Sequence, residues 1–143
     1  MHRLLPLLLL TLLLFGCVSR QRPDPRDTIT LYERLVQAMK PDSIARLFTQ
    51  NAEVGHAGQP SIKGRDSIFR FLSSFSTFHV LSNRDSITSM QERHDSAVAA
   101  GVYRQTVVVP SGDTVRVAGF FEATLVADPA GHWLIARMRT RSY

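Results

Sequence analysis

The sequence predicts an α+β domain in which helices pack on one face of a curved, mostly antiparallel sheet. Between residues 25 and 75 the apolar side chains recur at spacings of three and four, which is the period of amphipathic helices. From residue 78 onward the pattern changes to period two, over four segments that are separated by turn residues. Helices followed by a run of antiparallel strands indicate a sheet that curls over the helices.

Three helices are expected before the long strands. The first begins at Asp24, which can cap it, and Pro25 suits the first helical position. Its apolar stripe consists of Ile29, Tyr32, Leu35, Val36 and Met39. The second helix is expected from Pro41 to Asn51, with Ile44, Leu47 and Phe48 on its buried face. A short strand at 52–54, a glycine-rich loop at 55–62 and a third helix that begins at Gly64 complete this half.

Four strands are predicted in the second half, at about 78–93, 97–109, 114–127 and 132–141. The segments between them contain the Pro, Gly, Asp and Ser residues that tight turns require. Gly119 in the middle of a strand indicates a bend, and the segment 83–85 suggests a bulge in the first of these strands.

Strict alternation assigns each strand residue to a face of the sheet. The side chains of the third long strand expected to face the helices are Val115, Val117, Phe121, Ala123 and Leu125. In the last strand, Leu134, Ala136, Met138 and Thr140 are expected to face inward. The opposite side of that strand is expected to carry Trp133, Ile135, Arg137, Arg139 and Arg141.

The N-terminus indicates export. A short basic segment precedes an apolar run from Leu4 to Phe15, which is shorter than the ~20 residues that a membrane span needs. The run ends at Cys17, and the segment 14–17 resembles the bacterial lipobox. We therefore expect a lipoprotein signal peptide at 1–16, a lipidated Cys17 with a flexible tether at 17–24, and one domain at 25–143. The alternative is a cleaved signal peptide that removes Cys17 with it.

Composition narrows the function classes. The formal net charge is +5, but the charges are dispersed except near the C-terminus and no basic run is interleaved with aromatic residues, so nucleic-acid binding is not expected. The single cysteine excludes an internal disulfide. The histidines have no metal-ligand spacing, and there is no phosphate-binding glycine loop, so neither a metal nor a cofactor is expected. The expected location is the bacterial cell envelope, on the periplasmic face of the outer membrane where one exists.

The order of these elements resembles the nuclear transport factor 2-like superfamily, which includes ketosteroid isomerase and the polyketide-cyclase-like (SnoaL-like) enzymes. The resemblance is carried by the segments 47–54, 63–68 and 131–135 within this order, and it extends from about Pro25 to Arg141. It implies a cone-shaped α+β barrel whose wide end holds an apolar pocket. It also implies a homodimer formed through the outer sheet face, where Phe120 and Trp133 would be buried against a second subunit. The expected pocket residues are Val54, Phe71, Phe75, Ala123, Leu125 and Met138.

The resemblance to ketosteroid isomerase suggests two catalytic candidates. Tyr32 falls at the position of its oxyanion-hole tyrosine, and His56 falls where its general-base aspartate follows the first strand. The third catalytic position, an aspartic acid, falls on Ala123, so steroid isomerisation is not expected. An imidazole and a hydroxyl would still suit proton abstraction, ring closure or hydrolysis. For both residues a plain structural role, on a solvated loop for His56 and in the core for Tyr32, is favoured over catalysis.

Two functional hypotheses follow. The leading one is a membrane-anchored module that binds a small apolar ligand or a protein partner in or around the pocket. The alternative is a small isomerase, cyclase or hydrolase that uses His56 and Tyr32. The arginines at 137, 139 and 141 have two interpretations, an anion or lipid-headgroup site and a solvated sheet edge, and the second is favoured.

Overall fold

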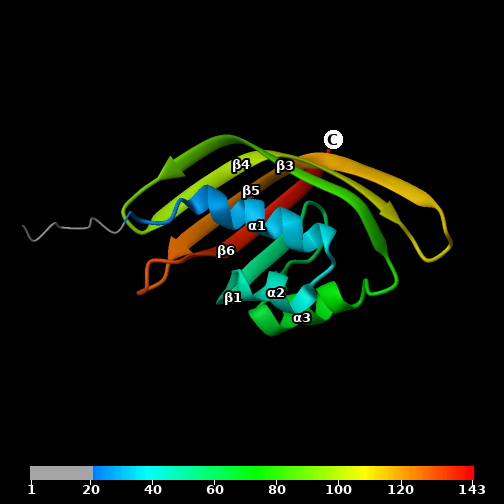
Figure 1. The fold of residues 1–143 in the computed structure, drawn as a ribbon, viewed down its shortest axis with the longest axis horizontal. Coiled ribbons are helices and arrows are strands. Elements are labelled where there is room, and N and C mark those ends of the chain that lie inside the picture. The colour runs from blue at the N-terminus through cyan, green and yellow to red at the C-terminus, as the bar shows by residue number, and fades with distance from the viewer. Residues whose placement is uncertain (1–20) are drawn as a thin grey trace, which may run out of the picture.

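The computed structural model describes residues 21–143, which form three helices on one side of a six-stranded sheet (Figure 1). The elements are α1 (Pro25–Gln37), α2 (Pro41–Arg46), β1 (Phe48–His56), β2 (Ile62–Lys63), α3 (Arg65–Ser73), β3 (His79–Glu92), β4 (Ser96–Val108), β5 (Thr114–Ala127) and β6 (Trp133–Ser142). The strand order is β2-β1-β6-β5-β4-β3. All neighbours are antiparallel except β1 and β6, which are parallel. The predicted α+β fold with a curved, mostly antiparallel sheet is confirmed.

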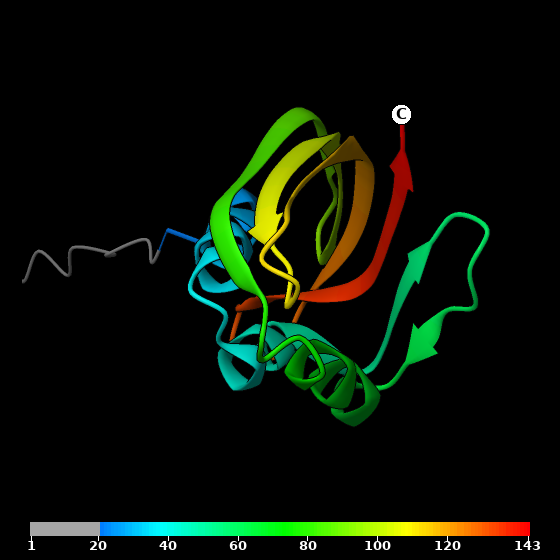
Figure 2. The ribbon, with the colours of Figure 1, turned by 90° about the vertical axis from the view of Figure 1, so that its right-hand side faces the viewer.

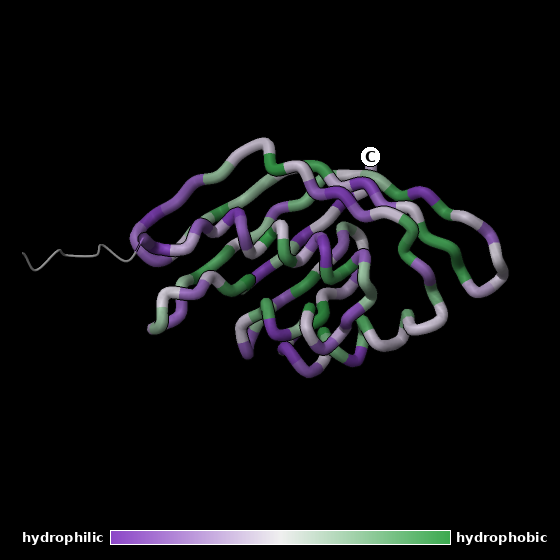
Figure 3. The backbone as a smooth tube through the Cα atoms, in the orientation of Figure 1, coloured by the Kyte–Doolittle hydropathy of each residue, from purple (hydrophilic) through white to green (hydrophobic). Residues whose placement is uncertain are grey.

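The sheet arches, and the helices fill its concave side. The arch is seen along the strands in Figure 2, where α1 lies at one side and α2 and α3 lie below the sheet. The end of β1 stays paired with β6, because His56 is the register partner of Thr140 and the N–H of Ala57 donates to the Thr140 carbonyl at 2.9 Å. Along the strands, hydrophilic and hydrophobic residues follow one another at short intervals (Figure 3). The predicted signal peptide and Cys17 lie outside the described residues. No helix within 21–143 has the length and hydropathy that crossing a membrane requires.

The first helix begins as predicted, because its capping groups are in place. The Asp24 side chain accepts a hydrogen bond from the backbone N–H of Arg26 at 2.8 Å, and Pro25 occupies the first turn. The predicted end of the second helix at Asn51 is wrong, since α2 ends at Arg46 and β1 begins at Phe48. Pairing with the last strand explains the difference. The carbonyl of Leu47 accepts from the N–H of Ile135 at 2.7 Å, so β6 holds the backbone that would have continued the helix.

Two glycines allow the long strands to coil closely. A side chain at Gly119 would place its Cβ 2.0 Å from the carbonyl oxygen of Arg141, and one at Gly101 would lie 2.1 Å from that of Ser86. Both contacts are far too short for any residue with a side chain, so these positions require glycine. The predicted bend at Gly119 therefore coincides with a point of close backbone approach. The irregularities of β3 lie between residues 80 and 82 and between 87 and 89, on either side of the predicted bulge at 83–85.

Part of the predicted facing of β6 is wrong. The register between β5 and β6 shifts after Thr124, because Leu125 pairs with Ile135 while Thr124 pairs with Arg137. One extra residue in β6 reverses the alternation at that point. Trp133 and Ile135 therefore face the helices, and Leu134 does not. Beyond the shift the prediction holds: the side chains of Arg137, Arg139 and Arg141 lie on the face opposite the helices, which we call the outer face, and those of Met138 and Thr140 lie on the inner face.

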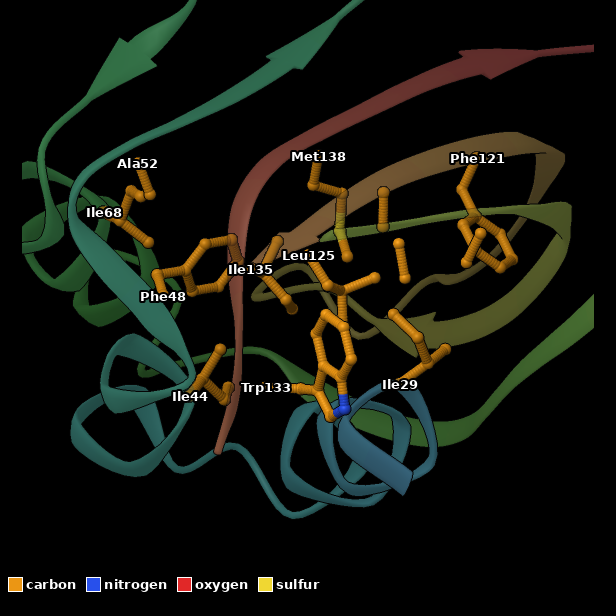
Figure 4. Packing of buried hydrophobic residues seen from close by; sticks show 13 residues of the cluster. Ile29, Ile44, Phe48, Ala52, Ile68, Phe121, Leu125, Trp133, Ile135 and Met138 are labelled. Atoms are coloured by element: carbon orange, nitrogen blue, oxygen red, sulfur yellow. The ribbon is translucent and has the colours of Figure 1, made fainter. Parts of the chain in front are cut away.

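The core lies between α1, the inner face of the sheet and the start of β1 (Figure 4). The ring of Phe48 and the side chains of Leu125 and Ile135 are almost fully removed from solvent. The cluster consists of Ile29, Ile44, Phe48, Ala52, Ile68, Ala97, Ala99, Phe121, Ala123, Leu125, Trp133, Ile135 and Met138. Alanines on β4 and β5 let the helices approach the sheet, and the aromatic residues fill the space at its margins.

Trp133 joins the N-terminal segment to the core. Its side chain is 3% exposed, and its indole N–H donates to the carbonyl of Pro23 at 2.7 Å. The guanidinium of Arg22 lies 4.5 Å from the ring centroid, and the Thr28 hydroxyl donates to the Trp133 carbonyl at 3.0 Å. The predicted dimer contact by Trp133 is therefore wrong, because this residue is buried within its own chain. The residues just before α1 are held against the domain.

Replacement of Trp133 tests whether its side chain is buried in the core. We expect Trp133→Ala to lower the free energy of unfolding by about 3–5 kcal/mol, because it leaves a cavity and an unpaired Pro23 carbonyl. Phe120→Ala, on the outer face, should cost about 1 kcal/mol or less. Urea unfolding of the two variants measures both values. Equal losses would contradict the assignment of the two rings to opposite faces.

Candidate functional site

An apolar pocket of about 210 Å³ opens at one end of the cone, between α2, α3 and the ends of β3 and β4. Its lining consists of Met39, Pro41, Ile44, Phe71, Leu72, Phe75, Phe78, Val80, Gln105 and Val107. The aromatic rings at 71, 75 and 78 stack edge to face, with centroids 5.0 and 5.1 Å apart. Gln105 is the one amide in this otherwise apolar lining. The pocket is suited to an apolar molecule that carries a polar group at one end.

The structure brings together only some of the predicted pocket residues. Phe71 and Phe75 line the apolar pocket. Ala123, Leu125 and Met138 are 0%, 0% and 4% exposed and belong to the closed core instead. They line neither this pocket nor the groove described below, and the half-buried Val54 packs beside them against the core. The helices fill the depth of the cone, so the space that remains is near its rim.

A polar patch lies behind the apolar pocket, on the inner face of β3 and β4. The strand register places Asn83 opposite Gln105 and Asp85 opposite Tyr103. The Gln105 amide donates to Asn83 Oδ1 at 3.4 Å, and the Asn83 amide donates to the backbone carbonyl of Glu33 at 3.3 Å. Asn83 is only 5% exposed. A chain of hydrogen bonds thus connects the pocket lining to α1.

Asp85 has an unusual environment within this patch. Burial, and then the nearby negative charge of Glu33, raise the pKa of Asp85 to about 7. Its backbone N–H donates to Glu33 Oε2 at 2.8 Å, so the Glu33 carboxylate is held beside Asp85. A carboxyl group with a pKa near neutrality can exist in both protonation states under physiological conditions, which is a property of acid–base catalysts.

Tyr32 adjoins this group on α1. Burial, and then the charge of Asp85, raise the pKa of the Tyr32 hydroxyl above its ordinary value. The phenol therefore stays protonated and can act as a hydrogen-bond donor. Its ring packs edge to face on Phe48, with centroids 6.1 Å apart. The hydroxyl-bearing side chain is thus fixed by the core at the edge of the polar patch.

The two predicted catalytic residues do not share a pocket in this structure. The Nδ1 atom of His56 lies 2.9 Å from Thr140 Oγ1, near the end of β1, and the residue borders a second hollow rather than the apolar pocket. Tyr32 lines neither hollow, and the charge of Asp85 contributes to the raised pKa of its hydroxyl. Sequence reasoning missed Asp85 because the segment 83–85 was interpreted as a bulge. Alternation from Ile87 would have placed both Asp85 and Asn83 on the inner face.

The second hollow is a groove of about 620 Å³ between the β1–β2 connection and the strands β4, β5 and β6. It is lined by Gly55, His56, Ala57, Gly58, Gln59, Ser61, Thr88, Ala100, Gly101, Phe120, Phe121, Glu122, Arg139, Thr140 and Arg141. The charged side chains among them belong to the outer face. Within residues 21–143 no group of three or more His, Cys, Asp or Glu side chains is placed to hold a metal ion.

Solved structures of low sequence identity share this fold. A ketosteroid isomerase-like protein from Erwinia carotovora atroseptica is 18% identical, with a TM-score of 0.74 over 82% of this chain and 92% of that one. A proposed scytalone dehydratase from Novosphingobium aromaticivorans is 20% identical, with a TM-score of 0.76 over 82% and 80%. A protein from Catenulispora acidiphila in complex with S-DNPA is 16% identical, with a TM-score of 0.66 over 82% and 89%.

The sequence itself gives the family. No match to a curated protein is significant. The model of the SnoaL-like domain matches residues 20–139, which include every helix and strand except the last residues of β6. The structural neighbours and the three helices on a curved six-stranded sheet agree with this match. The chain therefore belongs to the SnoaL-like domain family and has the nuclear transport factor 2-like fold that the sequence predicted.

Proposed function

We propose that the domain binds a small, mostly apolar molecule with one polar end in the pocket between α3 and β4. The observation that carries this proposal is a pocket that is lined by three packed phenylalanines and by the single amide of Gln105. The hydrogen bonds within the described residues use one N–H of this amide, toward Asn83. The other N–H and the carbonyl oxygen are then available to a ligand.

The size of the pocket limits the ligand. Pockets for drug-sized molecules occupy about 300–1,000 Å³, whereas this one has about 210 Å³. A molecule of one or two fused rings fits this space better than a four-ring steroid. Phe71 is 42% exposed at the rim, so the entrance is apolar as well. Burial of the ligand's apolar surface would supply most of the binding energy, and the amide would fix its orientation.

Filling the pocket should weaken ligand binding. We expect the full chain to bind 2-naphthol, a two-ring probe with one hydroxyl, and Val107→Trp to weaken that binding at least about tenfold, because the indole occupies the pocket. Val108→Trp is the matched control, since Val108 is the next residue of β4 and lies on the outer face. Fluorescence titration measures both. Unchanged binding in Val107→Trp would exclude this pocket as the site.

A second candidate function is proton transfer on a carbonyl compound, and the raised pKa of Asp85 favours it. The Asp85 carboxylate would act as the general base. The Tyr32 phenol, which stays protonated, would donate a hydrogen bond to the developing oxyanion. This pair replaces the predicted pair of His56 and Tyr32 in our proposal, because the charge of Asp85 acts on the Tyr32 phenol, whereas His56 borders the groove between the β1–β2 connection and β6.

Hydrogen–deuterium exchange on 2-tetralone tests this chemistry without knowledge of the natural substrate. We expect the chain to accelerate loss of the α-protons in D₂O, and the rate should rise with pH through about 7 as Asp85 loses its proton. Asp85→Asn and Tyr32→Phe should each lower the catalysed rate at least about a hundredfold. His56→Ala should leave it unchanged. An NMR time course that shows no acceleration over buffer, or a loss in His56→Ala alone, would rule out this assignment.

We also propose that Cys17 is lipidated and attaches the domain to the cell envelope, at the periplasmic face of an outer membrane. The proposal rests on the sequence of residues 1–17. The intact mass of the protein extracted from membranes tests it, since acylation of Cys17 adds the mass of its fatty chains.

A homodimer through the outer face likewise stays a prediction. Phe120, 37% exposed, and Tyr143 offer apolar area for it, whereas the arginines around them would oppose a two-fold contact.

A further inference from the structure

The groove on the outer face is separate from the interior pocket and has different chemistry. One wall is the connection between β1 and β2. The other consists mainly of outer-face residues of β4, β5 and β6, and it also includes Phe121 and Thr140, whose side chains belong to the inner face. Whereas the interior pocket is lined by aromatic and aliphatic side chains, this groove contains two arginines, Arg139 and Arg141, and one acidic residue, Glu122.

The two arginines project from the same face of β6. They are separated by one residue, so their Cα atoms are about 7 Å apart along the strand. The Arg141 guanidinium lies 4.3 Å from the centroid of the Phe120 ring, and this ring packs edge to face with Tyr143 at a centroid distance of 5.0 Å. Within residues 21–143 neither Arg139 nor Arg141 lies within 4.0 Å of a carboxylate oxygen. Both groups therefore retain donors for an external acceptor.

The surroundings of the groove are strongly positive. The strand registers place six arginines and Lys63 on the outer face, against two glutamates. The cations are Lys63, Arg84, Arg104, Arg116, Arg137, Arg139 and Arg141. The pKa of Glu53 responds to this field: a hydrogen bond from Ser61 lowers it most, and the charges of Lys63, Arg137 and Arg139 lower it further. A negative group at this face is thus stabilised by the residues around it.

We propose that this groove binds a phosphate group through Arg139 and Arg141. Two guanidinium groups that extend from neighbouring positions on one face can share the oxygens of a tetrahedral phosphate, whereas a carboxylate is satisfied by a single guanidinium. Phe120 forms an apolar floor beside them for the organic part of the molecule. Glu122 lies opposite Arg139 on β5 and opposes the anion. The phosphate can belong to a soluble ester or to a phospholipid headgroup, and the test separates these sources.

The experiment uses the full chain in micelles of a neutral detergent, with phenyl phosphate as the soluble probe. NMR titration at constant ionic strength should show saturable shifts of the backbone amides of β6. Arg139→Gln combined with Arg141→Gln should weaken binding at least about tenfold. Glu122→Gln should strengthen it about two- to threefold, since it removes the one opposing charge in the groove. A second titration replaces phenyl phosphate with phosphatidylglycerol added to the same micelles.

Arg46→Gln combined with Arg70→Gln is the matched control, because it removes the same charge from two exposed positions on α2 and α3. This variant should bind as the parent does. Saturation by phenyl phosphate identifies a soluble ester as the source, and a response to phosphatidylglycerol alone identifies a lipid headgroup. The proposal is overturned if neither probe causes saturable shifts, or if the control variant loses as much affinity as the groove variant. It is also overturned if Glu122→Gln weakens binding.

Discussion

The pairing of β6 with both of its neighbours is the constraint on which the rest of the structure depends. One extra residue between Ile135 and Arg137 changes which side chains face the helices. Before this point, Trp133 and Ile135 complete the core. After it, the arginines of β6 point to the outer face and Met138 still points inward. A strand with strict alternation would either expose the tryptophan on the outer face or turn the arginines toward the core. An unpaired buried guanidinium would cost several kcal/mol.

The same strand holds the two halves of the sequence together. Its parallel pairing with β1 begins at Phe48 and draws the chain out of α2, so the loop that follows β1 reaches the far end of β6. Parallel pairs need a long connection, and here the connection from β1 to β6 is most of the domain. The interior pocket and the outer groove are both products of this arrangement. The start of β1 determines where helix α2 ends, and the end of β1 determines where the wall of the groove begins.

The sequence predicted the long strands within one or two residues, because alternation and turn residues are local signals. It could not predict the start of β1, since Phe48 has the spacing of a helix face and only the contact with Ile135 makes it a strand residue. The bulge in β6 could not be predicted either, because an inserted residue does not change the local composition of the strand. Asp85 was missed because its significance lies in its neighbours Tyr32 and Glu33, which are about fifty residues away in the chain.

The two candidate sites differ in the burial of their charged groups. Inside the cone, burial and the charge of Glu33 raise the pKa of Asp85 to about 7. Its ionised form is therefore available at an energetic cost that a substrate or a change in pH can alter. On the outer face, the arginines are exposed and stand in excess over the acidic groups, so an anion there is attracted without desolvating a buried group. A ligand of the interior must therefore be mostly apolar, and a ligand of the groove must be charged. Because the six-stranded sheet separates the two sites, substitutions that abolish one are expected to leave the other intact.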